Sequence, residues 1–184
     1  MSLLTYGQPF GGIVQIAYFV EDIKKSIKEF IDVYNIGPWV VHGPFVPHAG
    51  RYRGKPTKVE VTLALAYSGH ISIELIQQHN DEPSVFKETF AKRGYGFHHF
   101  AIVTKDFDAE IARYQAMGYE EAFADQVLDS RMAYYDTSAG LQGGMTEIIE
   151  YTPKMEALQS KPYFANLDWD GKDGVHHMPI PPPV

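Results

Sequence analysis

Residues 12–22 (GIVQIAYFVED) and residues 96–106 (GFHHFAIVTKD) are two versions of one pattern. They align without a gap at an offset of 84, because Gln15 then falls on His99 (99 − 15 = 84). Each stretch is an apolar strand that ends at an aspartate suited to cap a following helix, Asp22 in the first and Asp106 in the second. The chain is therefore predicted to contain two copies of one small module.

A helix is predicted after each aspartate. After Asp22 the apolar residues fall on one face of a helix: Ile23, Ile27, Phe30, Ile31 and Tyr34. This helix is expected to stop at the breaker pair Gly37-Pro38. After Asp106 a shorter helix is expected to stop at Gly118, with the apolar residues Phe107, Ile111 and Tyr114 on its buried face.

Three strand-like runs follow each helix, so each module is predicted to be strand–helix–strand–strand–strand. The predicted runs are about 38–46, 57–67 and 70–77 in the first module, and about 119–127, 131–136 and 144–151 in the second. The resulting divisions are an N-terminal extension (1–11), the first βαβββ module (12–82), a connecting helix (83–95), the second module (96–152) and an irregular C-terminal tail (153–184). The Pro-rich tail is expected to wrap the surface or to reach a neighbouring subunit.

The predicted fold class is α+β. Two βαβββ modules are expected to form a paired, cupped mixed β-sheet with the helices on the outside and a concave surface between the modules. The pattern leaves two arrangements open, because the modules can pair within one chain or be exchanged between the chains of a homodimer.

The composition limits the classes of function. With 45% hydrophobic and 21% charged residues, the 184-residue chain is expected to fold around a sizeable core. A net charge of −7 argues against nucleic acid as a partner, and the absence of cysteine excludes disulfides and thiolate chemistry. No apolar run approaches the roughly 20 residues that span a bilayer. We therefore expect a cytoplasmic protein that acts on a small molecule, away from membranes and nucleic acid. A homodimer is also expected.

Four polar residues stand in the middle of apolar strands, on the faces expected to line the concave surface: Gln15, Glu74, His99 and Glu147. Taken singly, a strand glutamate is usually solvated and a strand histidine is usually packed and hydrogen-bonded. Four such residues at corresponding positions of two repeats favour a joint role, since a buried carboxylate needs a partner. Their oxygen and nitrogen atoms suit one divalent ion: Zn²⁺, Ni²⁺, Co²⁺, Mn²⁺ or Fe²⁺.

Residues 12–152 resemble the vicinal oxygen chelate superfamily, which includes glyoxalase I, methylmalonyl-CoA epimerase, extradiol dioxygenases and antibiotic resistance proteins. The most recognisable pieces are residues 96–102 (GFHHFAI) and 146–151 (TEIIEY). The resemblance implies that Gln15, Glu74, His99 and Glu147 are the metal ligands. A set with one histidine is similar to the glyoxalase I or epimerase side of the superfamily and disfavours oxygen activation.

The resemblance also implies a chemistry, in which a metal-bound enolate or oxyanion forms after proton removal beside a carbonyl. Glu147 is the first choice for the base, since its counterpart in glyoxalase-like enzymes serves as both ligand and base. Glu60, expected to face the cavity, is the candidate for a second acid–base group, with a solvated strand-end glutamate as the alternative. The predicted function is a metal-dependent isomerase or lyase acting on a small carbonyl compound. A methylmalonyl-CoA-type epimerase and a non-catalytic ligand-binding protein are the alternatives.

The loop between the second and third predicted strands concentrates positive charge in an acidic chain. Arg51, Arg53 and Lys55 could hold a carboxylate or a CoA phosphate at the cavity mouth, although a solvated hairpin is the more common explanation. By strand alternation His98 is expected to point away from His99, into the packed side of the sheet.

Overall fold

The computed structural model describes residues 3–140 and 143–179. The two corresponding stretches form strands β1 (Ile13–Phe19) and β7 (Gly96–Thr104), followed by helices α1 (Ile23–Tyr34) and α3 (Phe107–Ala116). The predicted caps are present. An Asp22 side-chain oxygen accepts hydrogen bonds from the backbone of Lys24 at 3.0 Å and Lys25 at 3.1 Å, and Asp106 accepts one from Ala109 at 3.0 Å.

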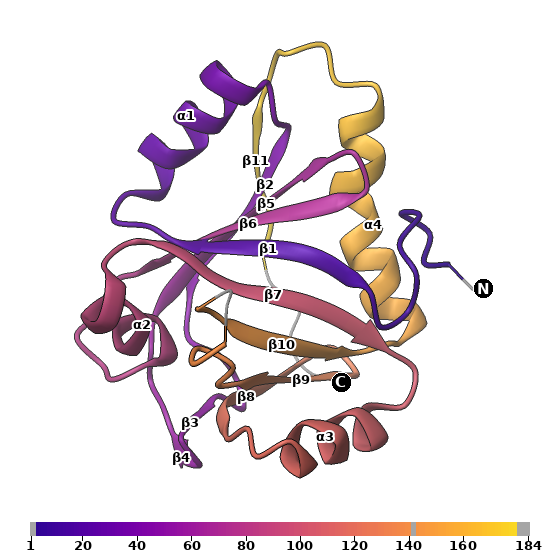
Figure 1. Cartoon of the computed structure of the whole chain (residues 1–184). Coiled ribbons are helices and arrows are strands. Elements are labelled where there is room, and N and C mark those ends of the chain that lie inside the picture. Colours follow the sequence, from indigo (N-terminus) through magenta and orange to yellow (C-terminus); the bar gives the residue numbers. More distant parts are fainter. Residues whose placement is uncertain (1–2, 141–142, 180–184) are drawn as a thin grey trace.

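The described strands form one mixed sheet (Figure 1). The first module adds β2 (Trp39–Phe45), β3 (Arg51–Tyr52), β4 (Lys55–Pro56), β5 (Val61–Ser68) and β6 (Ile71–Gln78). The second adds β8 (Glu121–Val127), β9 (Ser130–Tyr135) and β10 (Met145–Glu150), and helix α2 (Val85–Arg93) connects the modules. The sheet order is β11-β2-β5-β6-β1-β7-β10-β9-β8-β3-β4.

The two modules meet at the middle of this sheet. The orders β2-β5-β6-β1 and β7-β10-β9-β8 repeat one topology, and β1 pairs antiparallel with β7. In this structure one chain builds the whole cup from its own two modules. The predicted α+β class is confirmed.

Helices α1 and α3 cover the convex face of the sheet. Ile23 and Ile27 of α1 pack with Trp39, Ala64 and Leu75. In the second module, Phe107 and Tyr114 of α3 pack in the same way with Tyr135 and Ile148. Each helix is thus held by the apolar face that its sequence spacing predicts.

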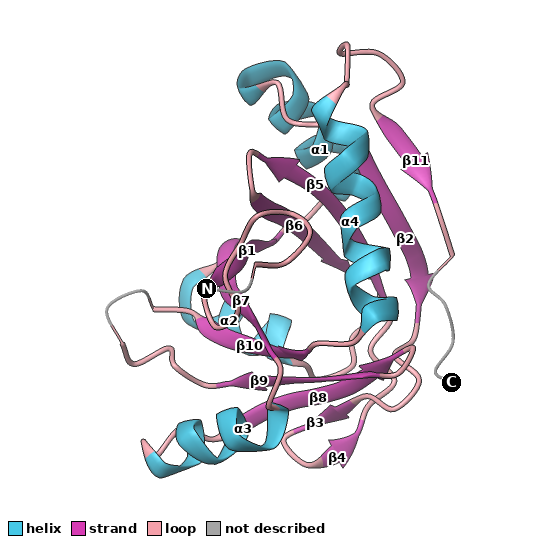
Figure 2. Ribbon diagram, turned by 90° about the vertical axis from the view of Figure 1, so that its right-hand side faces the viewer, coloured by secondary structure: helices cyan, strands magenta, loops and turns pink. Residues whose placement is uncertain are grey.

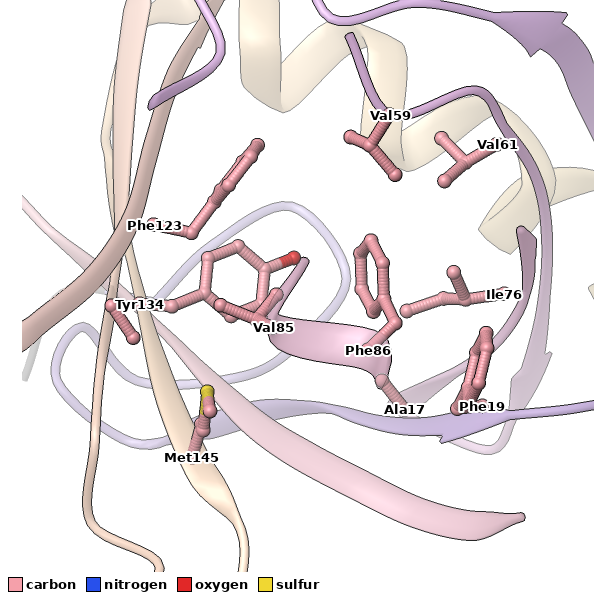
Figure 3. Packing of buried hydrophobic residues seen from close by; sticks show 11 residues of the cluster. Ala17, Phe19, Val59, Val61, Ile76, Val85, Phe86, Phe123, Tyr134 and Met145 are labelled. Carbon is pink, nitrogen blue, oxygen red and sulfur yellow. The ribbon is translucent and has the colours of Figure 1, made fainter. Parts of the chain in front are cut away.

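The concave face is filled at two ends. At one end, Val85 and Phe86 of α2 pack with residues of both modules, among them Phe19, Val61, Phe123, Tyr134 and Met145 (Figure 3). At the other end, Leu4 and Tyr6 from the N-terminal segment pack with Val14, Tyr67, Ala101, Val103, Ile149, Met155 and Tyr163. Side chains between these two clusters line the cavity described below.

The prediction of an irregular tail is wrong for much of its length. Helix α4 (Pro153–Leu167) is capped by Thr152, whose hydroxyl accepts from the backbone of Met155 at 3.1 Å. Strand β11 (Val175–His177) pairs with β2 and forms one edge of the sheet. Figure 2 shows α4 along the inner side of the first module, beside β5. Pro153 is compatible with a helix start, whereas Pro162 inside the helix hides it from sequence patterns. Residues 180–184 of the predicted tail lie outside the described residues.

The loop after β2 reaches across the mouth of the cup. Its hairpin β3–β4 pairs with β8 of the second module, with Arg51 opposite Ala124 and Tyr52 opposite Phe123. A segment of the first module thus joins the edge strand of the second, so the two rims of the cup are bridged. Within the described part of the chain, no helix is long and apolar enough to cross a bilayer.

Candidate functional site

The four polar residues singled out by the repeat lie together on the floor of the cup. They come from β1, β6, β7 and β10, and all are buried: Gln15 is 4% exposed, Glu74 6%, His99 0% and Glu147 4%.

The register of the central strands explains why they meet. Ala17 pairs with Glu74 on one side and His99 on the other, while Ala101 pairs with Gln15 and Glu147. Since alanine has no side chain beyond Cβ, the two alanines leave space between the four polar groups.

The polar atoms are separated as ligands of a single ion would be. Gln15 Nε2 lies 3.2 Å from Glu74 Oε2, and His99 Nε2 lies 3.6 Å from Glu74 Oε2 and 3.3 Å from Glu147 Oε2. Bonds of about 2.1 Å to one metal place neighbouring ligand atoms about 3.0 Å apart in an octahedron and about 3.4 Å apart in a tetrahedron. No group of three or more His, Asp and Glu side chains in the described chain is arranged as a finished metal site. The separations are close enough that small side-chain rotations would complete one.

A histidine pair orients the His99 ring. Residue His98 is the extra residue of a β-bulge, because Ala17 pairs with His99 and Tyr18 with Phe97. The bulge turns both rings toward each other, and the two Nδ1 atoms are 2.8 Å apart. The prediction that His98 points away from His99 is therefore wrong, since alternation fails at a bulge.

The hydrogen bonds of this pair determine which nitrogens carry protons. His98 Nε2 lies 3.2 Å from the carbonyl oxygen of Val85, which can only accept, so Nε2 donates. Burial, followed by the neighbouring His99, holds the pKa of His98 well below its usual value, so its ring is neutral and Nδ1 accepts. His99 Nδ1 then donates to His98, which leaves His99 Nε2 facing Glu74 and Glu147. This Nε2 atom is buried and has no hydrogen-bond partner.

The two carboxylates are electrostatically strained. Burial, followed by the charge of Glu147, raises the pKa of Glu74 well above its usual value. Two buried carboxylates around one space resist simultaneous ionisation unless a cation or a proton lies between them. The donor set and its charge thus fit a divalent cation.

Sequence reasoning missed Tyr134, which lies opposite Glu147 in the β9–β10 pairing. Burial, followed by the charge of Glu147 and a hydrogen bond to it, raises the pKa of the Tyr134 phenol well above its usual value, so the phenol keeps its proton. Strand alternation in β9 could have identified Tyr134 as a cavity residue, because it shares a face with Met132, which also lines the cavity.

The cavity above this floor has a volume of about 130 Å³. Its polar lining consists of Gln15, His42, Glu74, Asp125, Tyr134, Glu147 and Gln159. Its apolar lining comes from both modules, α2 and α4: Phe45, Pro47, Val61, Leu63, Leu65, Phe86, Phe123, Val127, Met132, Ile149, Met155, Leu158 and Pro162. None of these described lining residues is an arginine or a lysine.

Comparison with known proteins agrees with this architecture. Residues 14–135, well over half of the chain, match the family model of the glyoxalase/bleomycin resistance protein/dioxygenase superfamily. The chain belongs to this superfamily. No curated protein matches the chain in sequence.

Solved structures share the fold at low identity. A hypothetical protein from Bacillus halodurans C-125 has a TM-score of 0.57 and 20% identity, covering 77% of this chain and 94% of its own. Methylmalonyl-CoA epimerase from Mycobacterium tuberculosis has a TM-score of 0.52 and 20% identity, covering 85% of this chain and 95% of its own. At this identity the similarity shows the fold alone.

Glu60, the predicted second acid–base group, does not line the cavity. Val61, Leu63 and Leu65 are the residues of β5 that line the cavity, so Glu60 belongs to the opposite face. The prediction about its face is wrong. Both faces of β5 are apolar, because Ala64 and Ala66 pack beneath α1, and alternation therefore could not assign them.

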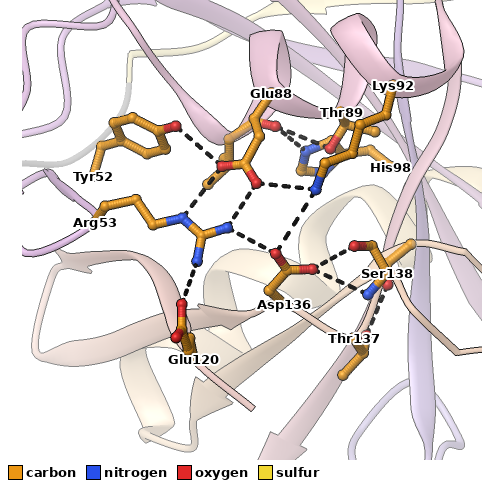
Figure 4. Close-up of polar contacts among 12 residues, drawn as sticks. Tyr52, Arg53, Glu88, Thr89, Lys92, His98, Glu120, Asp136, Thr137 and Ser138 are labelled. Atoms are coloured by element: carbon orange, nitrogen blue, oxygen red, sulfur yellow. Dashed lines mark hydrogen bonds and ion pairs between the residues drawn. The ribbon is translucent and has the colours of Figure 1, made fainter.

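Arg51, Arg53 and Lys55 lie on the bridging hairpin, and none of them lines the cavity. Arg53 Nη2 contacts Glu88 Oε1 and Asp136 Oδ2, both at 2.7 Å, and Nη1 lies 3.3 Å from Glu120 (Figure 4). Burial alone would raise the pKa of Asp136, but hydrogen bonds from Ser138 and Arg53 outweigh it and lower the pKa to about 2. The guanidinium thus has protein carboxylates as partners in place of the predicted substrate group.

Proposed function

We propose that this chain is a metal-dependent isomerase or lyase that acts on a small carbonyl compound through a metal-stabilised enolate. The observation that carries the proposal is the buried, unpartnered Nε2 of His99 beside two buried carboxylates, Glu74 and Glu147. An unpartnered imidazole nitrogen and two carboxylates in one buried space favour a bound cation. One divalent ion, of Zn, Ni, Co, Mn or Fe, would satisfy all three groups.

The residues that would hold this ion are Gln15, Glu74, His99 and Glu147. Gln15 has its amide nitrogen toward Glu74, so its side chain must turn to present Oε1 as a ligand. When bound, the ion supplies a Lewis acid that stabilises negative charge on a substrate oxygen, worth several kcal/mol.

Glu147 is the proposed base. It accepts the proton from the carbon next to the substrate carbonyl, the C–H bond breaks, and its electron pair moves into the enolate. Tyr134, which hydrogen-bonds Glu147 and keeps its phenolic proton, orients this carboxylate. Return of the proton to a different position gives an isomer, and loss of a leaving group from the enolate gives the lyase outcome.

Solvent deuterium exchange tests the proposal. The metal-loaded protein is incubated in D₂O with α-hydroxy-carbonyl compounds, hemithioacetals and branched acyl thioesters, and exchange at the α-carbon is followed by NMR. We expect exchange with at least one class, and its loss in Glu147→Gln. The matched control is Glu60→Gln, which changes a glutamate on the opposite face and should keep the wild-type rate. Absence of exchange with the whole panel would contradict the proposal.

A non-catalytic ligand-binding protein is the second candidate, favoured by the largely apolar lining of the cavity. It predicts saturable ligand binding without α-proton exchange. The epimerase alternative needs a second acid–base group, and Glu60 does not face the cavity. The remaining cavity carboxylate outside the proposed ligand set is Asp125, which accepts a hydrogen bond from the backbone of Ala49 at 3.0 Å. A homodimer and a cytoplasmic location stay predictions.

A further inference from the structure

The cavity carries its polar groups in two separate sets. Gln15, Glu74, Glu147 and Tyr134 form one set on the floor, around His99. The second set, His42, Asp125 and Gln159, belongs to the walls.

Each residue of the wall set already has one polar atom bonded to a protein partner. His42 Nδ1 lies 2.9 Å from the carbonyl oxygen of Met178, and Asp125 Oδ1 accepts from the backbone of Ala49 at 3.0 Å. Gln159 Oε1 accepts from the hydroxyl of Tyr6 at 3.1 Å. Polar recognition of a ligand is therefore concentrated at the floor, where the proposed ion would bind.

The walls also lack positive charge. No arginine or lysine is among the described residues that line the cavity, and the guanidinium of Arg53 is held by Glu88 and Asp136. A carboxylate or phosphate on the distal part of a ligand would be buried without a partner, at a cost of several kcal/mol.

Two elements restrict the mouth of the cavity. On one side, α4 places Met155, Leu158 and Pro162 against the space, and Glu156 anchors it by accepting from the backbone of Thr5 at 2.7 Å and from its hydroxyl at 2.8 Å. On the other side, the loop that carries Ala49 is bonded to β8 and its hairpin pairs with that strand. These contacts narrow the opening through which a long carrier group, such as that of CoA or glutathione, could extend from the cavity into solvent.

The volume of the cavity matches a small apolar group. An engineered apolar cavity of about 150 Å³ holds benzene. At about 130 Å³, this cavity is of comparable size. An aromatic ring or a branched chain of similar bulk would fill the space above the floor.

From these observations, and resting on the proposed function, we infer that the substrate is a small carbonyl compound whose remaining part is an uncharged aromatic or branched aliphatic group. It binds as a free molecule and is not carried as a conjugate of CoA or glutathione. The carbonyl end faces Glu147 and the proposed ion, and the apolar end lies against Leu63, Leu65 and Leu158.

Binding to matched ligands tests the inference. Isothermal titration calorimetry is run on the Zn²⁺-loaded and metal-free full chain with 2-hydroxyacetophenone, its 4-carboxylate derivative, isobutyryl-CoA and S-methylglutathione. We expect 2-hydroxyacetophenone to bind and the 4-carboxylate derivative to bind at least about 100-fold more weakly, because its charge is buried unpaired. The two carrier compounds should not compete.

Variants of α4 locate the binding. Leu158→Trp should fill the cavity and weaken binding of 2-hydroxyacetophenone at least about 10-fold, and Leu158→Ala should weaken it by a similar factor through lost contact. The matched control is Leu167→Trp, since Leu167 is 57% exposed at the end of the same helix. Circular dichroism of each variant verifies the fold, and the alanine variant keeps the test valid if the tryptophan variant does not fold.

The outcomes separate this inference from the proposed function. Tight binding of isobutyryl-CoA or S-methylglutathione, or no binding of 2-hydroxyacetophenone to either form of the protein, would overturn the inference. If deuterium exchange occurs only with a carrier-linked substrate, the proposed function stands and the inference fails. If 2-hydroxyacetophenone binds at the Leu158 site but no panel member undergoes exchange, the proposed function fails and the apolar ligand site remains.

Discussion

Arg53→Ala is expected to destabilise the protein. The guanidinium joins the bridging hairpin to Glu88 of α2 and to Asp136 just after β9, with bonds of 2.7 Å to each. Removing it leaves two partly buried carboxylates facing each other. Breaking a buried ion pair costs about 3–5 kcal/mol, whereas an exposed pair contributes about 0–1 kcal/mol.

The ion pairs of Arg53 with Glu88 and Asp136 are neither fully buried nor fully exposed, so their loss should cost an amount between these two values. Arg53 is 29% exposed and both carboxylates are 19% exposed, and Lys92 remains 3.2 Å from Glu88 and 4.0 Å from Asp136. We therefore expect a loss of about 2 kcal/mol in the free energy of unfolding. For a chain of this length that corresponds to a fall in Tm of about 4–8 °C.

Urea and thermal unfolding measure the effect, with Arg51→Ala as the matched control. Arg51 lies on the same hairpin but is exposed and donates one hydrogen bond, to the carbonyl oxygen of Gly54 at 2.6 Å. We expect the control to change stability by less than about 0.5 kcal/mol.

The pH dependence supplies a second readout. The folded-state pKa of Asp136, about 2, lies below its ordinary value of 3.8, because hydrogen bonds from Ser138 and Arg53 outweigh the effect of burial. This stabilisation is fully present above the ordinary pKa and is lost as the pH falls toward 2. The difference between wild type and Arg53→Ala should therefore shrink over that range. Equal stability of the two arginine variants, with loss of ligand affinity only in Arg53→Ala, would show that Arg53 binds substrate. That result would refute a stabilising role for its contacts with Glu88 and Asp136.

Two further predictions concern the floor of the cavity. His98→Phe should lower divalent-metal affinity about 10–100-fold in calorimetric titrations, because His98 no longer holds the orientation and tautomer of the His99 ring. The matched control is His42→Phe, which removes a buried histidine outside the proposed ligand set and should leave the affinity unchanged. Equal affinities for both variants would count against the histidine pair. Without metal, Glu74→Gln should be more stable than wild type above pH 4.5. Burial, followed by the charge of Glu147, raises the pKa of Glu74 in the folded protein. Wild-type stability therefore falls as the pH rises from 4.5 toward this raised pKa, and the glutamine variant does not lose it. Identical pH profiles of urea unfolding for the two proteins would contradict this.

The repeat was the most informative feature of the sequence. Matching Gln15 to His99 predicts two modules, and strand alternation then assigns Glu74 and Glu147 to the same concave face as these two residues. The structure brings the four side chains together, because the alternation of β1, β6, β7 and β10 is readable where one face packs on a helix.

The errors came from features that lack a local pattern. Alternation predicts the wrong face for Glu60 because β5 is apolar on both sides, and the wrong direction for His98 because a bulge leaves no mark in the sequence. Pro162 conceals α4, so the sequence predicts irregular chain where this helix lines the cavity. The carboxylates around Arg53 come from residues 35, 67 and 83 positions away, and only the folded chain shows them together.

Metal content tests the central claim most directly. The purified chain is dialysed against a chelator, reloaded with Zn²⁺ or Co²⁺, freed of excess ion and analysed for metal alongside Glu147→Gln and His99→Gln. We predict one ion per wild-type chain, with much lower content in both variants. Wild-type protein that retains no divalent ion at near-stoichiometric level, or variants that retain as much as wild type, would contradict the metal-centred account of this site.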